Sequence, residues 1–146
     1  MQLSRKVRCG LRILVQVGAE TAGTSRAVKG RMIAESQDLS EGYMEQLMIP
    51  LKDAGLIETV RGRSGGYRLG TSPSVVTLLD VMELFEGPMD LVDCNQGGLA
   101  CPRQSACPTS SAWARLSRAL RREASQIALS DLVRDVRSRR SPEYMI

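Results

Sequence analysis

The chain of 146 residues contains no histidine, and this absence narrows the metal sites that it could form. Zinc sites that combine cysteine with histidine are excluded, because no imidazole is present. The close C-x₂-C pairs of zinc ribbons are also absent. The sequence has neither a phosphate-binding glycine loop followed by Lys-Ser/Thr nor a nucleophile motif. Catalysis is therefore the least favoured class of function, and we expect that the protein is not an enzyme.

A long apolar segment is missing as well. Near the N-terminus, basic residues precede GLRILVQVGA, but Arg12, Gln16 and Glu20 interrupt the apolar run. A signal peptide needs about 7–15 uninterrupted apolar residues and a membrane span about 18. We therefore expect a cytoplasmic protein with no membrane partner. Thiols stay reduced in that compartment, so clustered cysteines indicate a metal site rather than disulfides.

The charge of the chain is only weakly informative. The formal net charge is +4, and residues 1–80 carry 11 Lys/Arg against 8 Asp/Glu. Such a balance is compatible with a nucleic-acid partner and equally with no charged partner. The hydrophobic content of 42% is that of an ordinary globular protein.

Residues 1–80 show the pattern of a winged helix-turn-helix domain. The first expected helix, residues 4–21, has an apolar stripe that contains Val7, Leu11, Leu14, Val15 and Gly18, with Arg5, Arg8, Arg12 and Gln16 facing away. A second covers residues 28–36, with Met32 and Ile33 turned inward. A third covers residues 41–54, with Ser40 as N-cap, Gly55 as C-cap and a kink or early end at Pro50. Two short strands, residues 57–61 and 66–69, complete the helix-helix-helix-hairpin order.

The remaining residues predict helices joined by a cysteine-containing loop. A short helix, residues 78–85, follows the N-cap Thr77. The region assigned to the end of this helix and the cluster-binding loop covers residues 81–109. Residues 110–136 comprise a long helix and a helical turn, and residues 137–146 a disordered tail. The long helix has an apolar stripe too narrow for deep burial, so we expect it to pair with a partner helix; the stripe contains Trp113, Leu116, Leu120, Ala124 and Ile127. The fold class is mainly α (α+β), a winged helix-turn-helix domain with a long C-terminal dimerisation helix.

The third helix is the candidate recognition helix, which enters the major groove of double-stranded promoter DNA. Gln can bond adenine through two hydrogen bonds, and Glu can accept from cytosine N4. We expect contacts to bases and phosphates from Ser40, Tyr43, Glu45 and Gln46. In the hairpin, Arg61 and Arg63 place two guanidinium groups on a glycine-rich tip suited to phosphates or the minor groove. Winged helices also serve as protein-interaction modules, so this pattern favours DNA binding without excluding that role.

Three of the four cysteines, Cys94, Cys101 and Cys107, lie within fourteen residues among Gly and Pro. The intervals of six and five residues are wider than those of zinc ribbons and suit a cluster whose iron atoms are spread over several ångströms. From the spacing alone, an iron–sulfur cluster is favoured, with a zinc site or a thiol-based redox switch as the alternatives.

The sequence closely resembles the Rrf-type regulators, a family that includes IscR-, NsrR- and RirA-like proteins. The segments that carry the resemblance are MQLSRKVRCGLRIL, LSEGYMEQLMIPLKDAGLIETVRGRSGGYRLG and the cysteine triplet, within about residues 1–136. The resemblance implies a homodimer joined along the long helix, with each cluster near the partner's first helix and cluster state controlling promoter affinity. It also implies that the residues named above for the recognition helix and wing contact DNA, and that the three cysteines are cluster ligands.

The fourth ligand departs from the family's pattern. Some members use a histidine three residues after the last cysteine, but Ser110 stands there. Others use an aspartate from the partner's first helix, where this chain has Arg8, which cannot ligate iron. Cys9 from the partner subunit is a candidate, although a shift of one residue turns a helical side chain by about 100°, and Cys9 could equally be a buried structural cysteine. A water, a small thiol or another group is the further alternative for the fourth position. The missing histidine favours a 4Fe–4S cluster over a 2Fe–2S cluster.

The resulting hypothesis is a transcriptional regulator that senses iron, nitric oxide or redox status through its cluster. A different class stays open, namely a cluster-free winged-helix module that binds DNA or regulates an enzyme by contact, with thiol-based or zinc-dependent control.

Overall fold

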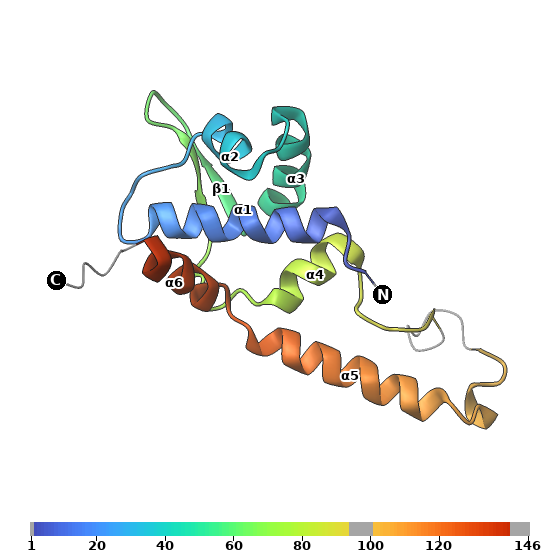
Figure 1. Ribbon diagram of the computed structural model, residues 1–146. Coiled ribbons are helices and arrows are strands. Elements are labelled where there is room, and N and C mark those ends of the chain that lie inside the picture. The colour runs from blue at the N-terminus through green and yellow to red at the C-terminus, as the bar shows by residue number, and fades with distance from the viewer. Residues whose placement is uncertain (1, 94–100, 141–146) are drawn as a thin grey trace.

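Local capping interactions set the ends of the first helices in the computed structural model, which describes residues 2–93 and 101–140 (Figure 1). Helix α1 (Arg5–Thr21) begins after Ser4, whose hydroxyl accepts a hydrogen bond from the Val7 N–H. Helix α3 (Glu41–Asp53) begins after Ser40, whose hydroxyl accepts from the Tyr43 N–H at 3.2 Å. Ser40 is therefore an N-cap, as predicted.

The end of α3 also follows its sequence. Gly55 adopts a φ of +71°, and hydrogen bonds from Gly55 N to Lys52 O and from Leu56 N to Leu51 O close the helix, both at 2.9 Å. Of the kink or early end expected at Pro50, the early end does not occur, because α3 continues to Asp53; the kink stays a prediction. Leu51 is fully buried just after the proline, and its burial outweighs one missing backbone hydrogen bond.

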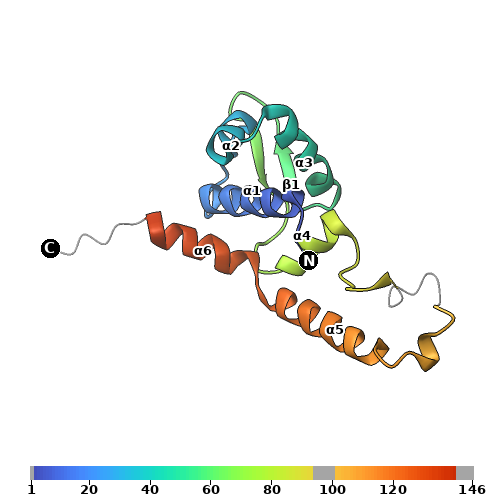
Figure 2. The ribbon, with the colours of Figure 1, turned by 45° about the vertical axis from the view of Figure 1, so that its right-hand side comes forward.

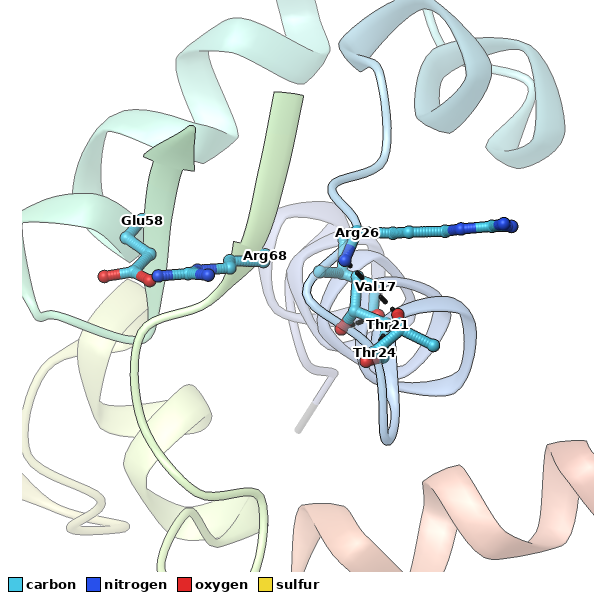
Figure 3. A network of polar contacts seen from close by, with 6 residues as sticks. All are labelled: Val17, Thr21, Thr24, Arg26, Glu58 and Arg68. Atoms are coloured by element: carbon cyan, nitrogen blue, oxygen red, sulfur yellow. Dashed lines mark hydrogen bonds and ion pairs between the residues drawn. The ribbon is translucent and has the colours of Figure 1, made fainter. Parts of the chain in front are cut away.

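The wing is tied to the helical part of the domain. Strands β1 (Ile57–Val60) and β2 (Gly66–Leu69) are antiparallel, with Glu58 opposite Arg68, and these two side chains form an ion pair (Figure 3). Val28, just before α2 (Gly30–Gln37), pairs with Tyr67 through two backbone hydrogen bonds of 2.8 Å. This isolated bridge extends the pairing on β2 beyond β1 and holds the wing beside α2.

The main core lies where α1, α3 and the wing meet, and most of the predicted apolar positions contribute to it. Ile33 is fully buried as predicted, but Met32 is 53% exposed, so its predicted inward orientation was wrong. Gln16 was also assigned wrongly, because it is only 5% exposed. Its Oε1 accepts from Ser36 and Gln37, both at 2.6 Å, so the polar side chain is satisfied at the contact between α1 and α2.

The last helix belongs to the core rather than to a frayed end. Helix α4 (Leu78–Glu86) is followed by α5 (Ser110–Gln126) and α6 (Leu129–Arg140), and α6 packs on α1. Leu129 and Val133 are buried in the main core. The expectation of disorder was wrong for residues 137–140, which are helical because α6 is held against α1. Residues 141–146 lie outside the described residues.

We expect Leu129→Ala to lower the free energy of unfolding by about 2–5 kcal/mol, because it leaves a cavity where a side chain 2% exposed now fills the core. Chemical denaturation measures this change. Met32→Ala is the control, since its exposed side chain should contribute less than about 0.5 kcal/mol. A similar loss in both variants would contradict the placement of α6 in the core.

Helix α5 extends away from the rest of the domain, on the side of α1 opposite to α2 and α3 (Figures 1 and 2). A second, smaller core joins it to the domain through the buried Val7, Met82, Met89 and Ala124. On its outer surface, Trp113 and Leu116 are 42% and 52% exposed. Six α-helices and one two-stranded sheet thus make up the described part of the chain, a mainly α winged-helix fold. Within residues 2–93 and 101–140, no helix is long and apolar enough to cross a membrane.

Candidate DNA-binding surface and cysteine loop

The predicted recognition residues of α3 and its N-cap differ in exposure and in the contacts that they already make. Glu45 and Gln46 are exposed and point away from the core, as base-reading side chains must. Ser40 is exposed too, but its hydroxyl is engaged in capping, so its side chain has less capacity for a DNA contact. Tyr43 is partly buried against the main core.

Tyr43 has a partner that the sequence reasoning missed. The guanidinium group of Arg5 lies over the Tyr43 ring, 5.1 Å from its centroid, in a cation–π contact. This contact joins the start of α1 to the first turn of α3 and holds a positive charge beside the recognition helix. No local pattern connects two residues so far apart in sequence, so only the fold reveals the pair.

The wing presents the two predicted arginines to solvent. Arg61 and Arg63 are exposed, and neither forms an ion pair with any other described residue. Gly62 between them adopts a φ of +106°, a conformation that favours glycine. Both guanidinium groups are therefore available for phosphates.

The base of the wing requires a glycine for a different reason. A Cβ on Gly66 would lie 2.3 Å from the carbonyl oxygen of Val28, so only glycine allows this close approach of two backbones. Nearby, the loop after α1 is held by hydrogen bonds from Thr24 Oγ1 to Thr21 O and from Arg26 N to Thr24 Oγ1, of 3.2 and 3.3 Å. The Arg26 side chain extends away from this network (Figure 3) and is a further exposed cation two residues before Val28.

The cysteine loop is described in part. Cys101 and Cys107 are partly exposed free thiols on either side of the short 3₁₀ helix η2 (Gln104–Ala106), and Cys94 lies outside the described residues. The Thr109 hydroxyl, 3.4 Å from Cys107 Sγ, is the main cause of a lowered pKa for this thiol, with the Thr109 and Ser110 backbone N–H groups assisting. Among residues 2–93 and 101–140, no three metal-ligating side chains form a group.

These two thiols have the chemistry that a cluster ligand needs. Thiolate is the form that binds iron, and the hydrogen bonds at Cys107 favour it. Neither thiol forms a disulfide with another residue that the structure describes. The sulfur donors of Cys101 and Cys107 are therefore of the chemical type that binds iron in iron–sulfur proteins.

Cys9 has a different environment. Its side chain is 5% exposed and packs in the main core of its own protomer. The neighbouring Arg8 is exposed. Burial favours the structural role over ligation of a partner's cluster, because a thiolate reaching another subunit would have to leave this core.

Two contacts hold the start of the cysteine loop and helix α4 against α5. The Leu91 N–H donates to Ser117 Oγ at 3.1 Å, and Ser117 is 2% exposed on α5. Arg121 on α5 forms a 2.8 Å ion pair with Glu83 on α4. The start of the loop is thus bonded to α5, and α5 is in turn paired with α4.

Comparison with known proteins agrees with the winged-helix fold described above. The model of the Rrf2 family, described as an iron-dependent transcriptional regulator, matches residues 3–135. The transcriptional regulator CymR of Bacillus subtilis (strain 168) is 33% identical over 132 residues, which cover 90% of this chain and 89% of CymR.

Solved structures show the same fold. The structure of B. subtilis CymR, described as the global cysteine regulator, has a TM-score of 0.74 and 32% identity, covering 91% of this chain and 96% of CymR. The structure of T. potens IscR has a TM-score of 0.76 and 28% identity, covering 98% and 93% of the two chains. The family match, these similarities and the winged-helix architecture lead to one conclusion: this chain belongs to the Rrf2 family of DNA-binding transcriptional regulators.

Proposed function

We propose that the protein is a homodimeric regulator that binds promoter DNA through α3 and the wing, under the control of an iron–sulfur cluster held by Cys94, Cys101 and Cys107. The observation that carries the DNA-binding part is the exposure of Glu45 and Gln46 together with two wing arginines that have no ion-pair partner among the described residues. Helix α3 and the tip of the wing lie on the side of α1 away from α5 (Figures 1 and 2), so one duplex can contact both.

The dimer in this proposal forms along α5. Ser117 and Ala124 face the rest of the protomer, whereas Trp113, Leu116 and Ile127 are 39–52% exposed on or at the end of the same helix. Such apolar side chains are costly to leave in water and are suited to a helix–helix contact between two copies. A twofold dimer then presents two recognition helices to two half-sites.

The cluster in this proposal adjusts the arrangement of the dimer. An iron–sulfur cluster held by these three thiols would supply a redox-active group that iron supply or nitric oxide could affect. Cys101 and Cys107 lie just before α5, and Leu91 is bonded to Ser117 in its middle. Reordering this loop would shift α5 and hence the spacing of the two recognition helices. We favour a 4Fe–4S cluster, since the chain has no histidine to complete a mixed ligand set.

A second candidate is a cluster-free regulator with thiol-based control. The partly exposed free thiols of Cys101 and Cys107 favour it, as does the likeness to a regulator described as the global cysteine regulator. In this case, oxidation or modification of the thiols would replace cluster assembly as the signal.

The test compares DNA affinity with and without the cluster. Wild-type protein is isolated anaerobically, its iron and acid-labile sulfide are measured, and duplexes are selected from a randomised DNA pool with the isolated form. Fluorescence anisotropy then gives the affinity of the cluster-loaded and cluster-free forms for one selected duplex. We expect the two affinities to differ by about 5- to 150-fold, the range of a coupling free energy of 1–3 kcal/mol.

Two outcomes would contradict parts of the proposal separately. Equal affinities of the two forms would rule out control by the cluster while leaving DNA binding intact. Colourless, iron-free protein from anaerobic isolation would rule out the cluster and favour the thiol-based alternative.

A further inference from the structure

The outward face of α3 contains apolar as well as polar residues. The buried residues Met44, Leu47, Met48 and Leu51 define the inner face of this helix. At about 100° per residue, Gly42, Gln46 and Ile49 form a line along the side opposite to these residues. This line is the part of α3 that would penetrate deepest into a major groove.

Ile49 is unusual on this line because it is large, apolar and 56% exposed. It lies outside both hydrophobic cores and is not among the residues packed against them. Exposed single apolar residues are common on protein surfaces, but this one follows Gln46 by three residues on the surface proposed to read bases. Ile49 therefore contributes to neither hydrophobic core of its own protomer.

Gly42 is a second observation on the same line. A Cβ built at this position meets no atom within 4 Å, and its φ lies outside the region that favours glycine. Neither packing nor backbone conformation within the protomer requires glycine, which is a poorer helix former than alanine. The absence of a side chain instead leaves room for an outside group to approach the helix backbone closely.

We propose that Ile49 is a specificity-determining residue that contacts the C5-methyl group of a thymine in each half-site, with Gly42 allowing the close approach of DNA. The inference rests on the DNA binding proposed above. Thymine is the one base that presents a methyl group in the major groove, and apolar side chains recognise it there. Gln46 reads a neighbouring base by hydrogen bonds, so the line combines polar and apolar readout.

The test removes the methyl group from the DNA and the side chain from the protein. Each thymidine of a duplex selected by the wild-type protein is replaced in turn by deoxyuridine, which lacks only the C5-methyl group. We expect one position per half-site at which wild-type affinity falls about fourfold, the effect of removing one methyl group that is buried in the complex. The Ile49→Ala variant should bind the thymidine and deoxyuridine duplexes equally at that position.

Matched variants separate specific from general effects. Met32→Ala removes a similarly exposed apolar side chain from α2 and should keep the full thymidine preference. Gly42→Ala should fold at least as stably as the wild type, by thermal denaturation, yet bind every selected duplex more weakly.

Three results would overturn the inference. If deoxyuridine has no effect at any position, or if its effect persists unchanged in Ile49→Ala, Ile49 does not read a thymine methyl although the protein binds DNA. If the wild-type protein selects no duplex from the pool, the proposed function fails and this inference fails with it.

Discussion

Replacing both Arg61 and Arg63 by alanine should weaken binding to a selected duplex by roughly 10- to 100-fold. Both side chains are exposed on the wing tip without an ion-pair partner among the described residues, so their charges are free to displace cations from phosphates. The slope of log affinity against log salt concentration should fall in magnitude by about 0.9 for each phosphate that the wing no longer neutralises, about 1.8 for the two arginines together. Anisotropy titrations at several salt concentrations measure both quantities.

The control for this variant is Arg137→Ala, which removes an exposed arginine from α6. Helix α6 packs on α1 away from α3 and the wing (Figure 1), so the affinity and salt slope should stay near those of the wild type. An unchanged slope in the Arg61 and Arg63 double variant would show that the wing does not contact phosphates.

Replacing Cys107 by serine should abolish stable cluster binding and leave the protein with the DNA affinity of the cluster-free form. Serine keeps the size of the side chain but removes the thiolate that Thr109 helps to stabilise. Iron and sulfide contents after anaerobic isolation should fall from near one cluster per protomer to background. The difference in DNA affinity between anaerobic and air-exposed protein should disappear as well.

Cys9→Ala is the matched control for this experiment. Because Cys9 is 5% exposed in the main core, we expect this variant to retain its cluster, with at most a modest loss of stability. Loss of the cluster in Cys9→Ala without unfolding would instead identify Cys9 as the fourth ligand. Retention of a full cluster by Cys107→Ser would contradict the ligand set.

Elements whose ends depend on local chemistry could be predicted from the sequence. Ser40 and Gly55 bound α3 because a hydroxyl and a left-handed glycine satisfy backbone groups within a few residues. Thr77 forms a capping box with Asp80 at the start of α4 for the same reason. The order of helices and strands then identified the winged-helix fold.

Features that depend on distant contacts were assigned wrongly or missed. Gln16 looked like a solvent-facing residue, but Ser36 and Gln37 lie 20 and 21 residues away and supply its hydrogen bonds in the buried contact. The helical state of residues 137–140 follows from the packing of α6 on α1. An amphipathic pattern indicates that a face is buried, but it does not name the element that covers it.

The candidate site also combines features set by local sequence with features set by distant contacts. The exposure of Glu45, Gln46 and the wing arginines follows from helical periodicity and turn chemistry, and agrees with the sequence expectation. The stacking of Arg5 on Tyr43 could not be foreseen, because it depends on how α1 crosses α3. The assignment of Cys94 as a ligand stays a prediction, since this residue lies outside the described part of the chain.

The pairing of Val28 with Tyr67 has a consequence for how such a regulator is controlled. Two backbone hydrogen bonds and the close approach at Gly66 hold the wing against the residues before α2, and α2 and β1 both pack on the recognition helix α3. Recognition helix and wing therefore belong to one packed DNA-binding unit. Under the proposed mechanism, a signal at the cysteine loop leaves the affinity of each DNA-binding unit for an isolated half-site unchanged. Control then acts on the cooperativity with which the two DNA-binding units of the dimer bind one duplex.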